Sequence, residues 1–155
     1  MEPFFKDYLE RLNKLHTDIR LEIQDLSQEG LNWKPSPEMN SIAVIITHLA
    51  GAERYYIGDV AGQEPSNRVR ESEFRVNDVD AYTLQELLAS ADTFAAQVLG
   101  RLTLSDLEAE RSMTGHVETH TAGWALLHAL EHTGLHLGHI QIQLQMWDQS
   151  HLAGN

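Results

Sequence analysis

The segment His128-Ala-Leu-Glu-His132-Thr-Gly-Leu-His136-Leu-Gly-His139 places four histidines at gaps of four, four and three residues. These gaps follow the repeat of an α-helix, so a helix over this segment puts all four imidazoles on one side. At about 100° of rotation per residue, the four side chains span a wedge of about 80°. Imidazole is the commonest metal-ligating side chain. The segment therefore predicts a helix with a histidine cluster, and a metal site is the first explanation for that cluster.

The helix that carries the cluster is predicted to run from about Ala122 to Trp147 and to be apolar on nearly every side. A helix of that kind lies at the centre of a bundle and contacts more than one neighbour. Gly134 and Gly138 lie four residues apart on the side away from the histidines, where they leave room for another backbone. That backbone belongs either to another helix of the bundle or to a second copy of the chain across a dimer interface.

Three further helices are predicted from the spacing of apolar residues. Their predicted bounds are about Pro3–Ser27, Ser41–Val60 and Thr83–Leu102. Gly30 is expected to lie just past the end of the first helix, as a terminator. Ser41 is the expected N-cap of the second helix, and Thr83-Leu-Gln-Glu86 has the spacing of a capping box for the third.

The connections between these helices differ in length and composition. Residues 31–40 contain two prolines within three residues and are predicted to be a loop. Residues 61–81 are polar and form a long crossover or flap, and residues 103–121 are irregular. Since no segment has a convincing strand pattern, we expect an all-α four-helix bundle with a long connection between helices 2 and 3, and residues 1–155 as a single domain.

Composition limits the possible partners. The formal charge of −12 argues against a nucleic-acid backbone or an anionic membrane surface. The absence of cysteine excludes disulfides, thiolate metal ligands and a cysteine nucleophile. No window approaches the roughly 20 apolar residues of a membrane span, and the N-terminus lacks the pattern of a signal peptide. We therefore expect a cytoplasmic protein with no membrane partner and no nucleic-acid partner.

Two clustered histidines can converge on one ion, because residues at i and i+4 face the same side of a helix. Both His128 with His132 and His132 with His136 have this spacing, and spacing alone does not choose between them. His48, beside the apolar stripe of the second helix, is the natural third ligand. Three protein nitrogens leave coordination positions open, as in catalytic sites, and they suit zinc, nickel, cobalt or iron better than magnesium or calcium.

Three segments give the chain a resemblance to the DinB/YfiT-like superfamily of four-helix-bundle, metal-dependent proteins. They are Leu31-Asn-Trp33-Lys-Pro35 with Ser41-Ile42 after it, Thr47-His48-Leu49-Ala50-Gly51-Ala52-Glu53, and His132-Thr-Gly-Leu-His136-Leu-Gly138-His139. The last segment looks like the family's His-x-x-x-His-x-Gly-Gln or His-x-Gly-His signature. With the helix pattern, the resemblance covers essentially the whole chain.

The resemblance implies a metal triad of His48, His132 and His136. It implies zinc or nickel as the ion, with iron, cobalt and manganese as the other candidates. It also implies thiol transfer or thiol-dependent isomerisation with a low-molecular-weight thiol, or hydrolysis, and a homodimer. The chain departs from some members in having His139 where they have glutamine, and in having the extra His128 one turn earlier.

Other residues have structural as well as functional interpretations. His128 and His139 are expected to pack, to orient a ligand or to shuttle a proton near bound water. Trp33, Tyr55 and Tyr56 are expected either to line a pocket or to pack in the core.

Glu53, His116 and His120 are expected to have roles other than metal binding. Glu53 lies about 140° around the helix from His48, so it is expected to form a buried ion pair with an arginine. His116 and His120 lie in the irregular stretch and are expected to be exposed to solvent, with the rim of a pocket as the alternative.

The histidine pattern therefore predicts a three-histidine divalent-metal protein, and the resemblance implies a metal-dependent enzyme of the thiol S-transferase or hydrolase type that acts on a small molecule. Because the chain has no cysteine, thiol chemistry requires a thiol cosubstrate from outside. The alternative is a non-catalytic metal-binding or interaction protein, a dimeric bundle with a stress-related role. A deep pocket beside the ion favours the enzyme, whereas four protein ligands without a cavity favour the alternative.

Overall fold

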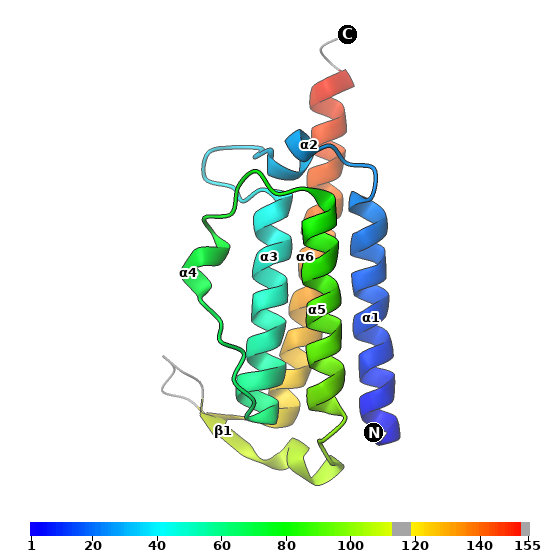
Figure 1. Cartoon of the computed structure of the whole chain (residues 1–155), viewed down its shortest axis with the longest axis vertical. Helices are drawn as coiled ribbons and strands as arrows, with labels where there is room; N and C mark the ends of the chain where they lie inside the picture. Colours follow the sequence, from blue (N-terminus) through cyan, green and yellow to red (C-terminus); the bar gives the residue numbers. More distant parts are fainter. Residues whose placement is uncertain (113–118, 153–155) are drawn as a thin grey trace.

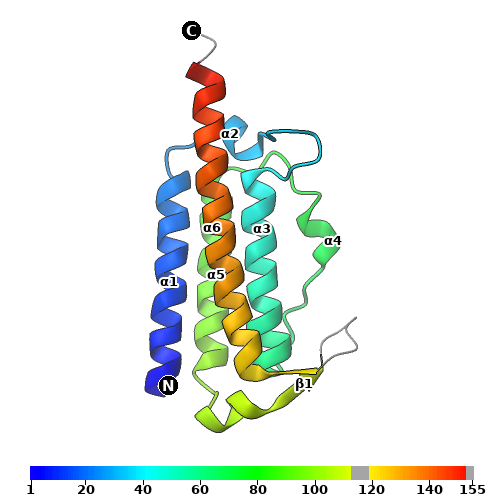
Figure 2. The ribbon, with the colours of Figure 1, turned by 180° about the vertical axis from the view of Figure 1, so that it is seen from behind.

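Four long helices lie side by side in the structure, a computed structural model that describes residues 1–112 and 119–152 (Figures 1 and 2). The helices are α1 (Pro3–Ile23), α3 (Ile42–Glu53), α5 (Ala81–Leu99) and α6 (Ala122–Leu152). The helix α3 continues without a break into the π-helix η1 (Arg54–Gly62). The predicted all-α four-helix bundle is thereby confirmed.

Short elements fill the connections. They are α2 (Gln28–Asn32), α4 (Arg70–Glu73), the 3-10 helix η2 (Leu104–Glu108), and the strands β1 (Glu110–Ser112) and β2 (Thr119–Thr121). The two strands are antiparallel, with Glu110 opposite Thr121, so the predicted irregular stretch contains regular structure at both of its described ends. In Figure 1 the connection between η1 and α5 runs beside α3 and carries α4 on the flank of the bundle. This connection is the predicted long crossover.

Capping hydrogen bonds determine where α3 and α5 begin. The predicted N-cap at Ser41 is confirmed, because its Oγ accepts a hydrogen bond from the backbone N–H of Val44 at 3.3 Å. The predicted start of the third helix at Thr83 is wrong. Asp80 is the N-cap, and its Oδ1 accepts from the Thr83 backbone N–H at 2.8 Å, so that α5 begins at Ala81.

The ends of the first and last helices also differ from prediction. The first helix ends at Ile23, and Gly30 is a buried residue within α2 rather than a terminator. The last helix extends past Trp147 to Leu152, where it projects beyond the rest of the bundle (Figure 1).

Two glycines allow η1 to pack closely against α5. A Cβ atom at Gly58 would lie 2.6 Å from the ring of Phe94, and one at Gly62 would lie 2.2 Å from the side chain of Val98. Non-bonded heavy atoms cannot approach so closely, so both positions require glycine, which has no side chain. The close packing holds the second helix in place at its C-terminal end.

The core consists of two apolar layers with a polar layer between them. One apolar layer includes Phe5, Leu12, Ile57, Ala95 and Ala129. The other includes Ile19, Leu49, Leu88, Ala91 and Ile140. Between them along the helices lie three buried polar residues, His16 of α1, Glu53 of α3 and Thr133 of α6. These three residues reappear in the candidate site, because they lie at the level of the histidines.

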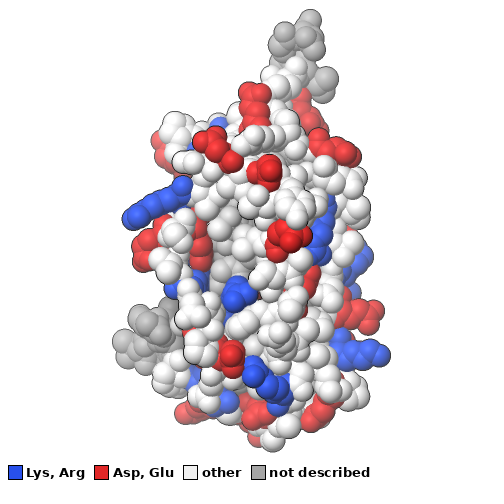
Figure 3. Space-filling model, viewed as in Figure 1, with Lys and Arg blue, Asp and Glu red and all other residues white. Residues whose placement is uncertain are grey.

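The surface carries charges of both signs. Acidic and basic side chains are interspersed over the face shown in Figure 3, and the described residues form no broad basic patch there. None of the described helices is both long and apolar enough to cross a membrane.

Candidate metal centre

Three histidines from two helices converge at the side of the bundle. His48 comes from α3, and His132 and His136 come from successive turns of α6. Each offers one ring nitrogen, and these three atoms lie within 4.8 Å of one another. The Nε2 atoms of His132 and His136 are 3.2 Å apart. These distances allow the three nitrogens to surround one ion after small rotations of the rings.

Burial keeps two of these imidazoles neutral. Removal from water, followed by the neighbouring His136 and His48, lowers the pKa of His132 to about 3. Removal from water, followed by His48 and His139, lowers the pKa of His136 to about 4. A neutral imidazole has a free nitrogen lone pair at pH 7, and this is the form that binds a metal.

The polar atoms of the triad are incompletely satisfied by the described residues. Nδ1 of His132 is buried and has no hydrogen-bond partner among them. An unpaired buried nitrogen costs free energy of about 1–3 kcal/mol, so its retention calls for an explanation. An ion held through Nε2 of His132, the atom that faces His136, would leave this Nδ1 unpaired, so the fit of an ion rests on the donor set: three imidazole nitrogens suit zinc, nickel, cobalt or iron.

A carboxylate outside the triad holds His48. Oε2 of Glu73 lies 2.9 Å from Nδ1 of His48, and the carboxylate also accepts two hydrogen bonds from the guanidinium of Arg68, at 2.6 and 2.9 Å. Burial opposes ionisation of Glu73, but the hydrogen bonds from Arg68 and His48 prevail and lower its pKa. The ionised carboxylate keeps the proton of His48 on Nδ1. The lone pair of Nε2 is then free to bind a metal ion.

Gly51 makes the approach of Glu73 possible. A Cβ atom at position 51 would lie 2.1 Å from Oε1 of Glu73. Glu73 was not predicted as a site residue, because it lies in the polar connection, where no helical repeat relates it to His48. Gly51 lies one turn after His48 within a predicted helix, and a glycine there was the sole signal that another group approaches.

The two remaining histidines of the cluster lie beside the triad without joining it. Nδ1 of His139 is 3.3 Å from Nδ1 of His136, and His139 is exposed. His128 is half-buried and stacks on Trp124, with ring centroids 4.9 Å apart, whereas its ring centroid is 5.9 Å from that of His132. The group that can hold a metal therefore contains the pair His132 and His136 rather than His128 and His132.

The irregular stretch contributes one described histidine. His120 was predicted to be exposed to solvent, but it is half-buried, because its ring stacks on Trp124 with centroids 3.9 Å apart. His116 lies outside the described residues.

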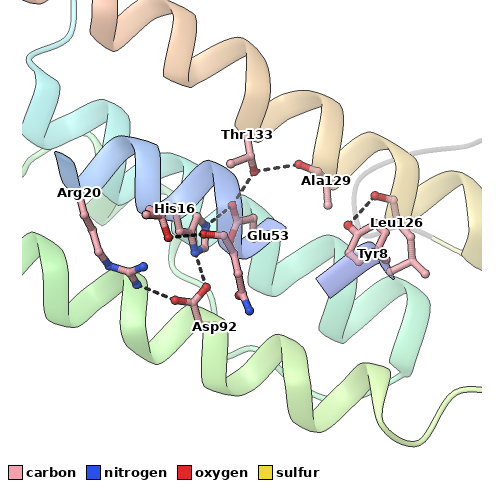
Figure 4. A network of polar contacts seen from close by, with 10 residues as sticks. Tyr8, His16, Arg20, Glu53, Asp92, Leu126, Ala129 and Thr133 are labelled. Carbon is pink, nitrogen blue, oxygen red and sulfur yellow. Dashed lines mark hydrogen bonds and ion pairs between the residues drawn. The ribbon is translucent and has the colours of Figure 1, made fainter. Parts of the chain in front are cut away.

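A polar network centred on the buried residues His16, Glu53 and Thr133 lies inside the bundle (Figure 4). Oε1 of Glu53 lies 2.8 Å from Nε2 of His16 and accepts a hydrogen bond from the hydroxyl of Thr133 at 2.5 Å. The predicted ion pair of Glu53 with an arginine is therefore wrong. Arg20 instead pairs with Asp92 at 2.6 Å, and Asp92 contacts the other ring nitrogen of His16.

The charges of this network favour a protonated His16. Burial disfavours the protonated form, but the charge of Glu53 and the hydrogen bonds to Asp92 and Glu53 prevail and raise the pKa of His16 to about 9. Since Thr133 follows His132 and Glu53 ends the helix that bears His48, the network joins the two helices that carry the triad.

Two grooves lie near the triad, and only the smaller one has a triad histidine among its described lining residues. Tyr55 and Tyr56 line a polar groove of about 780 Å³ together with Arg68 and Arg70. A second groove of about 380 Å³ is mostly apolar and includes His136 in its lining. Trp33 lies elsewhere, at a separate hollow near α2, and its ring packs edge-on against Trp147 with centroids 5.6 Å apart.

Comparison with known proteins supports the fold. A family model of the DinB superfamily matches residues 11–140. The chain is also similar to the crystal structure of a DinB-like protein from Bacillus subtilis, with a TM-score of 0.71 and 17% identity over 92% of each chain. A DinB-like protein from Bacillus cereus gives a TM-score of 0.74 and 15% identity over 92% of each chain.

A conserved protein from Enterococcus faecalis gives a TM-score of 0.78 and 14% identity over 94% of this chain and 98% of the other. Identities this low show a common fold and carry no information on the reaction. No curated protein matches the sequence.

Proposed function

Because the chain belongs to the DinB superfamily, we propose that it is a metal-dependent enzyme that transfers a low-molecular-weight thiol to a small molecule, or hydrolyses such a molecule. The observation that carries the proposal is the convergence of three ring nitrogens from His48, His132 and His136 within 4.8 Å. Two grooves beside this triad provide room for small molecules.

The three histidines would hold a divalent ion, and the side chains in contact with them would keep them in position. Zinc and nickel are the ions we favour, with iron, cobalt and manganese as alternatives, because all three donors are imidazole nitrogens. When bound, such an ion lowers the pKa of a coordinated water or thiol and so supplies a nucleophile at neutral pH. Glu73 holds His48 through Nδ1 and leaves its Nε2 free as a donor.

Proton transfer would fall to a histidine beside the triad. His139 is exposed and lies 3.3 Å from His136, so it can exchange a proton with solvent at the edge of the site. His128 is the second candidate, although its contacts are with Trp124 and the ring of Tyr56.

A thiol cosubstrate would bind in the polar groove. The chain has no cysteine, so the thiol comes from outside, and low-molecular-weight thiols carry charged and polar groups. Arg68 and Arg70 contribute positive charge to the groove, and Asp59 and Glu71 contribute negative charge, so it offers partners for both carboxylate and amino groups of such a thiol. Tyr55 and Tyr56 form part of its wall. Arg68 also contacts Glu73, which connects this groove to His48.

We further propose that the protein forms a homodimer through the outer face of α6. Cβ atoms built at Gly134 and Gly138 meet no atom within 4 Å. No neighbouring element among the described residues therefore approaches these positions, which supports the interpretation that they leave room for a second copy. A groove between α1 and α6 opens at Gly134, and its lining combines leucines, Leu127 among them, with the charged residues Arg11, Lys14, Asp18 and Glu131. A second copy would meet both apolar and charged groups there.

Metal content tests the proposed function directly. Tag-free wild-type protein, purified after growth with added zinc and nickel, is compared with His132→Ala and His136→Ala by mass spectrometry. We expect about one equivalent of metal in the wild type and little in either variant. His151→Ala, at an exposed histidine of the same helix, is the matched control and should keep the metal. Absence of metal from every sample contradicts the proposal.

Turnover separates the enzyme from a non-catalytic metal protein. The metal-loaded protein is assayed with glutathione, and separately with cysteine, against a small electrophile, and the loss of the thiol is followed. We expect turnover that disappears in His132→Ala. A protein that holds metal but gives no thiol transfer and no ester hydrolysis would instead be a binding protein.

A further inference from the structure

An apolar groove lies against the triad, on the side toward the C-terminus of α6. Its apolar wall consists of Met39, Ile45, Ile142 and Met146, and His136 and His139 form its border with the triad. The groove has a volume of about 380 Å³. For comparison, a cavity of about 150 Å³ holds a benzene ring, so this groove has room for a ring or a short alkyl chain.

The lining of the groove selects against anions. Glu38 is the one charged side chain among its described lining residues; it accepts a hydrogen bond from Ser36 at 2.9 Å, and no lysine or arginine lies among those lining residues. A negatively charged group entering the groove would be repelled, whereas an uncharged apolar group would replace water on the methionine and isoleucine side chains.

Gln143 closes one end of the groove. Its side chain is 2% exposed, and its Nε2 donates to the backbone carbonyl of Trp33 at 3.0 Å. This bond fixes the amide of Gln143 against the loop before α3. A pre-formed apolar hollow with few polar groups is the usual form of a small-molecule site.

We infer that this groove binds the apolar part of the substrate, an uncharged alkyl chain or single aromatic ring whose polar head group lies at the triad. The inference rests on the proposed function, because it takes the triad as the metal centre. It assigns the two flanking grooves to different molecules: the polar groove to the cosubstrate and the apolar groove to the acceptor.

Alkyl hydroxamic acids of two lengths test the inference. The hydroxamate group binds a metal ion, so acetohydroxamic and hexanohydroxamic acid place chains of different length beside the same anchor. Each fully buried methylene strengthens binding by up to about fourfold. Because the groove is open on one side, we expect hexanohydroxamate to bind the zinc-loaded protein at least tenfold more tightly than acetohydroxamate in isothermal titration calorimetry.

Two matched variants localise the effect. Ile142, which lines the groove, and Leu135, which does not, are 58% and 57% exposed on the same helix, so neither substitution opens the core. Ile142→Ser should reduce the preference for the longer chain at least threefold, and Leu135→Ser should leave it unchanged.

The outcomes separate the two proposals. A protein that takes up none of zinc, nickel, iron, cobalt and manganese overturns the proposed function and this inference with it. A protein that takes up zinc and binds both hydroxamates equally overturns the inference alone. If Ile142→Ser leaves both affinities unchanged and instead abolishes self-association in sedimentation velocity, the groove is a subunit interface, and the inference is again overturned.

Discussion

Oε2 of Glu73 lies 2.9 Å from Nδ1 of His48, although the two residues belong to different helices and the segment that bears Glu73 lies outside the four-helix bundle. The connection between η1 and α5 therefore does more than join two helices. It places the ionised carboxylate of Glu73 against Nδ1 of His48, where the carboxylate fixes the orientation of the ring and the position of its proton.

Replacement of Glu73 by glutamine should weaken metal binding while the triad itself stays intact. In Glu73→Gln the negative charge behind His48 is lost, and outer-sphere changes of this kind typically reduce metal affinity by about 10- to 100-fold. Competition with a coloured zinc chelator measures the change. Glu71→Gln, at an exposed neighbour on α4, is the control, and equal affinities in the two variants would show that Glu73 has no part in binding.

A methyl group at position 51 should have a similar effect by a steric route. The new Cβ in Gly51→Ala would lie 2.1 Å from Oε1 of Glu73, so Glu73 must move away from His48. We expect zinc affinity to fall about tenfold or more, even though alanine is the better helix former by about 1 kcal/mol.

The control for this substitution is Gly138→Ala, because a Cβ there meets no atom within 4 Å. This variant should gain helix stability and keep its affinity. Loss of affinity in both variants would point to a general effect of alanine on the helices.

The stability of the protein should fall from neutral to alkaline pH because of His16. An unfolded histidine has a pKa near 6.5, and in the folded chain Glu53 and Asp92 outweigh the opposing effect of burial and raise it to about 9. The folded state thus binds the proton more tightly. The resulting stabilisation is complete below pH 6.5 and is lost as the pH rises through 9.

This contribution amounts to about 3 kcal/mol. Urea unfolding at pH 6.5 and pH 9.5 measures it, with His16→Gln as the reference for all other titrating groups. Between these two pH values, we expect the free energy of unfolding to fall less in His16→Gln than in the wild type. An identical fall in both proteins would show that His16 does not cause the pH dependence.

Removal of Glu53 should destabilise the fold strongly. In Glu53→Ala the buried, protonated His16 keeps only Asp92 as a partner, and breaking a buried ion pair typically costs about 3–5 kcal/mol. Thr133→Val removes one hydrogen bond to the same carboxylate and should cost about 1 kcal/mol. Thermal unfolding gives both values. Glu22→Ala, which removes a contact with Gln141 at the surface, should change stability by less than about 0.5 kcal/mol.

The outer face of α6 should carry self-association. We expect a dimer in sedimentation velocity for the wild type and a monomer for Gly134→Leu, because a large side chain prevents the approach of a second backbone. Gly134→Ala should remain dimeric. A monomeric wild type at micromolar concentration would contradict the proposed homodimer.

The helical repeat of the sequence accounts for most of what could be predicted. The gap of four residues between His132 and His136 predicts both a helix and a shared face, and the structure places the two rings with Nε2 atoms 3.2 Å apart. Ser41 was predictable as an N-cap for a similar reason, since capping depends on residues only three positions apart. His48 was predictable as the third ligand from its place beside the apolar stripe of another helix, whereas the choice of the pair His132 and His136 depended on the resemblance to a family.

Features that depend on distant parts of the chain escaped prediction. Glu73 reaches His48 through a polar connection without a repeat. His16 occupies a core position between Leu12 and Ile19 of α1, which marks it as buried, but the sequence gives no means of pairing it with Glu53 and Asp92. The strands β1 and β2 have three residues each, too few for an alternating pattern to be recognised.

The triad joins the second helix of the bundle to the last one. His48 is reached early in the chain, whereas His132 and His136 lie on α6, so the three donors come together only after the last helix has packed. An ion at this site would bind only after the bundle has assembled, and it would slow the unfolding of the assembled protein. Metal occupancy would thus mark molecules that have completed folding, and the supply of the ion in the cell would influence how many of them escape degradation.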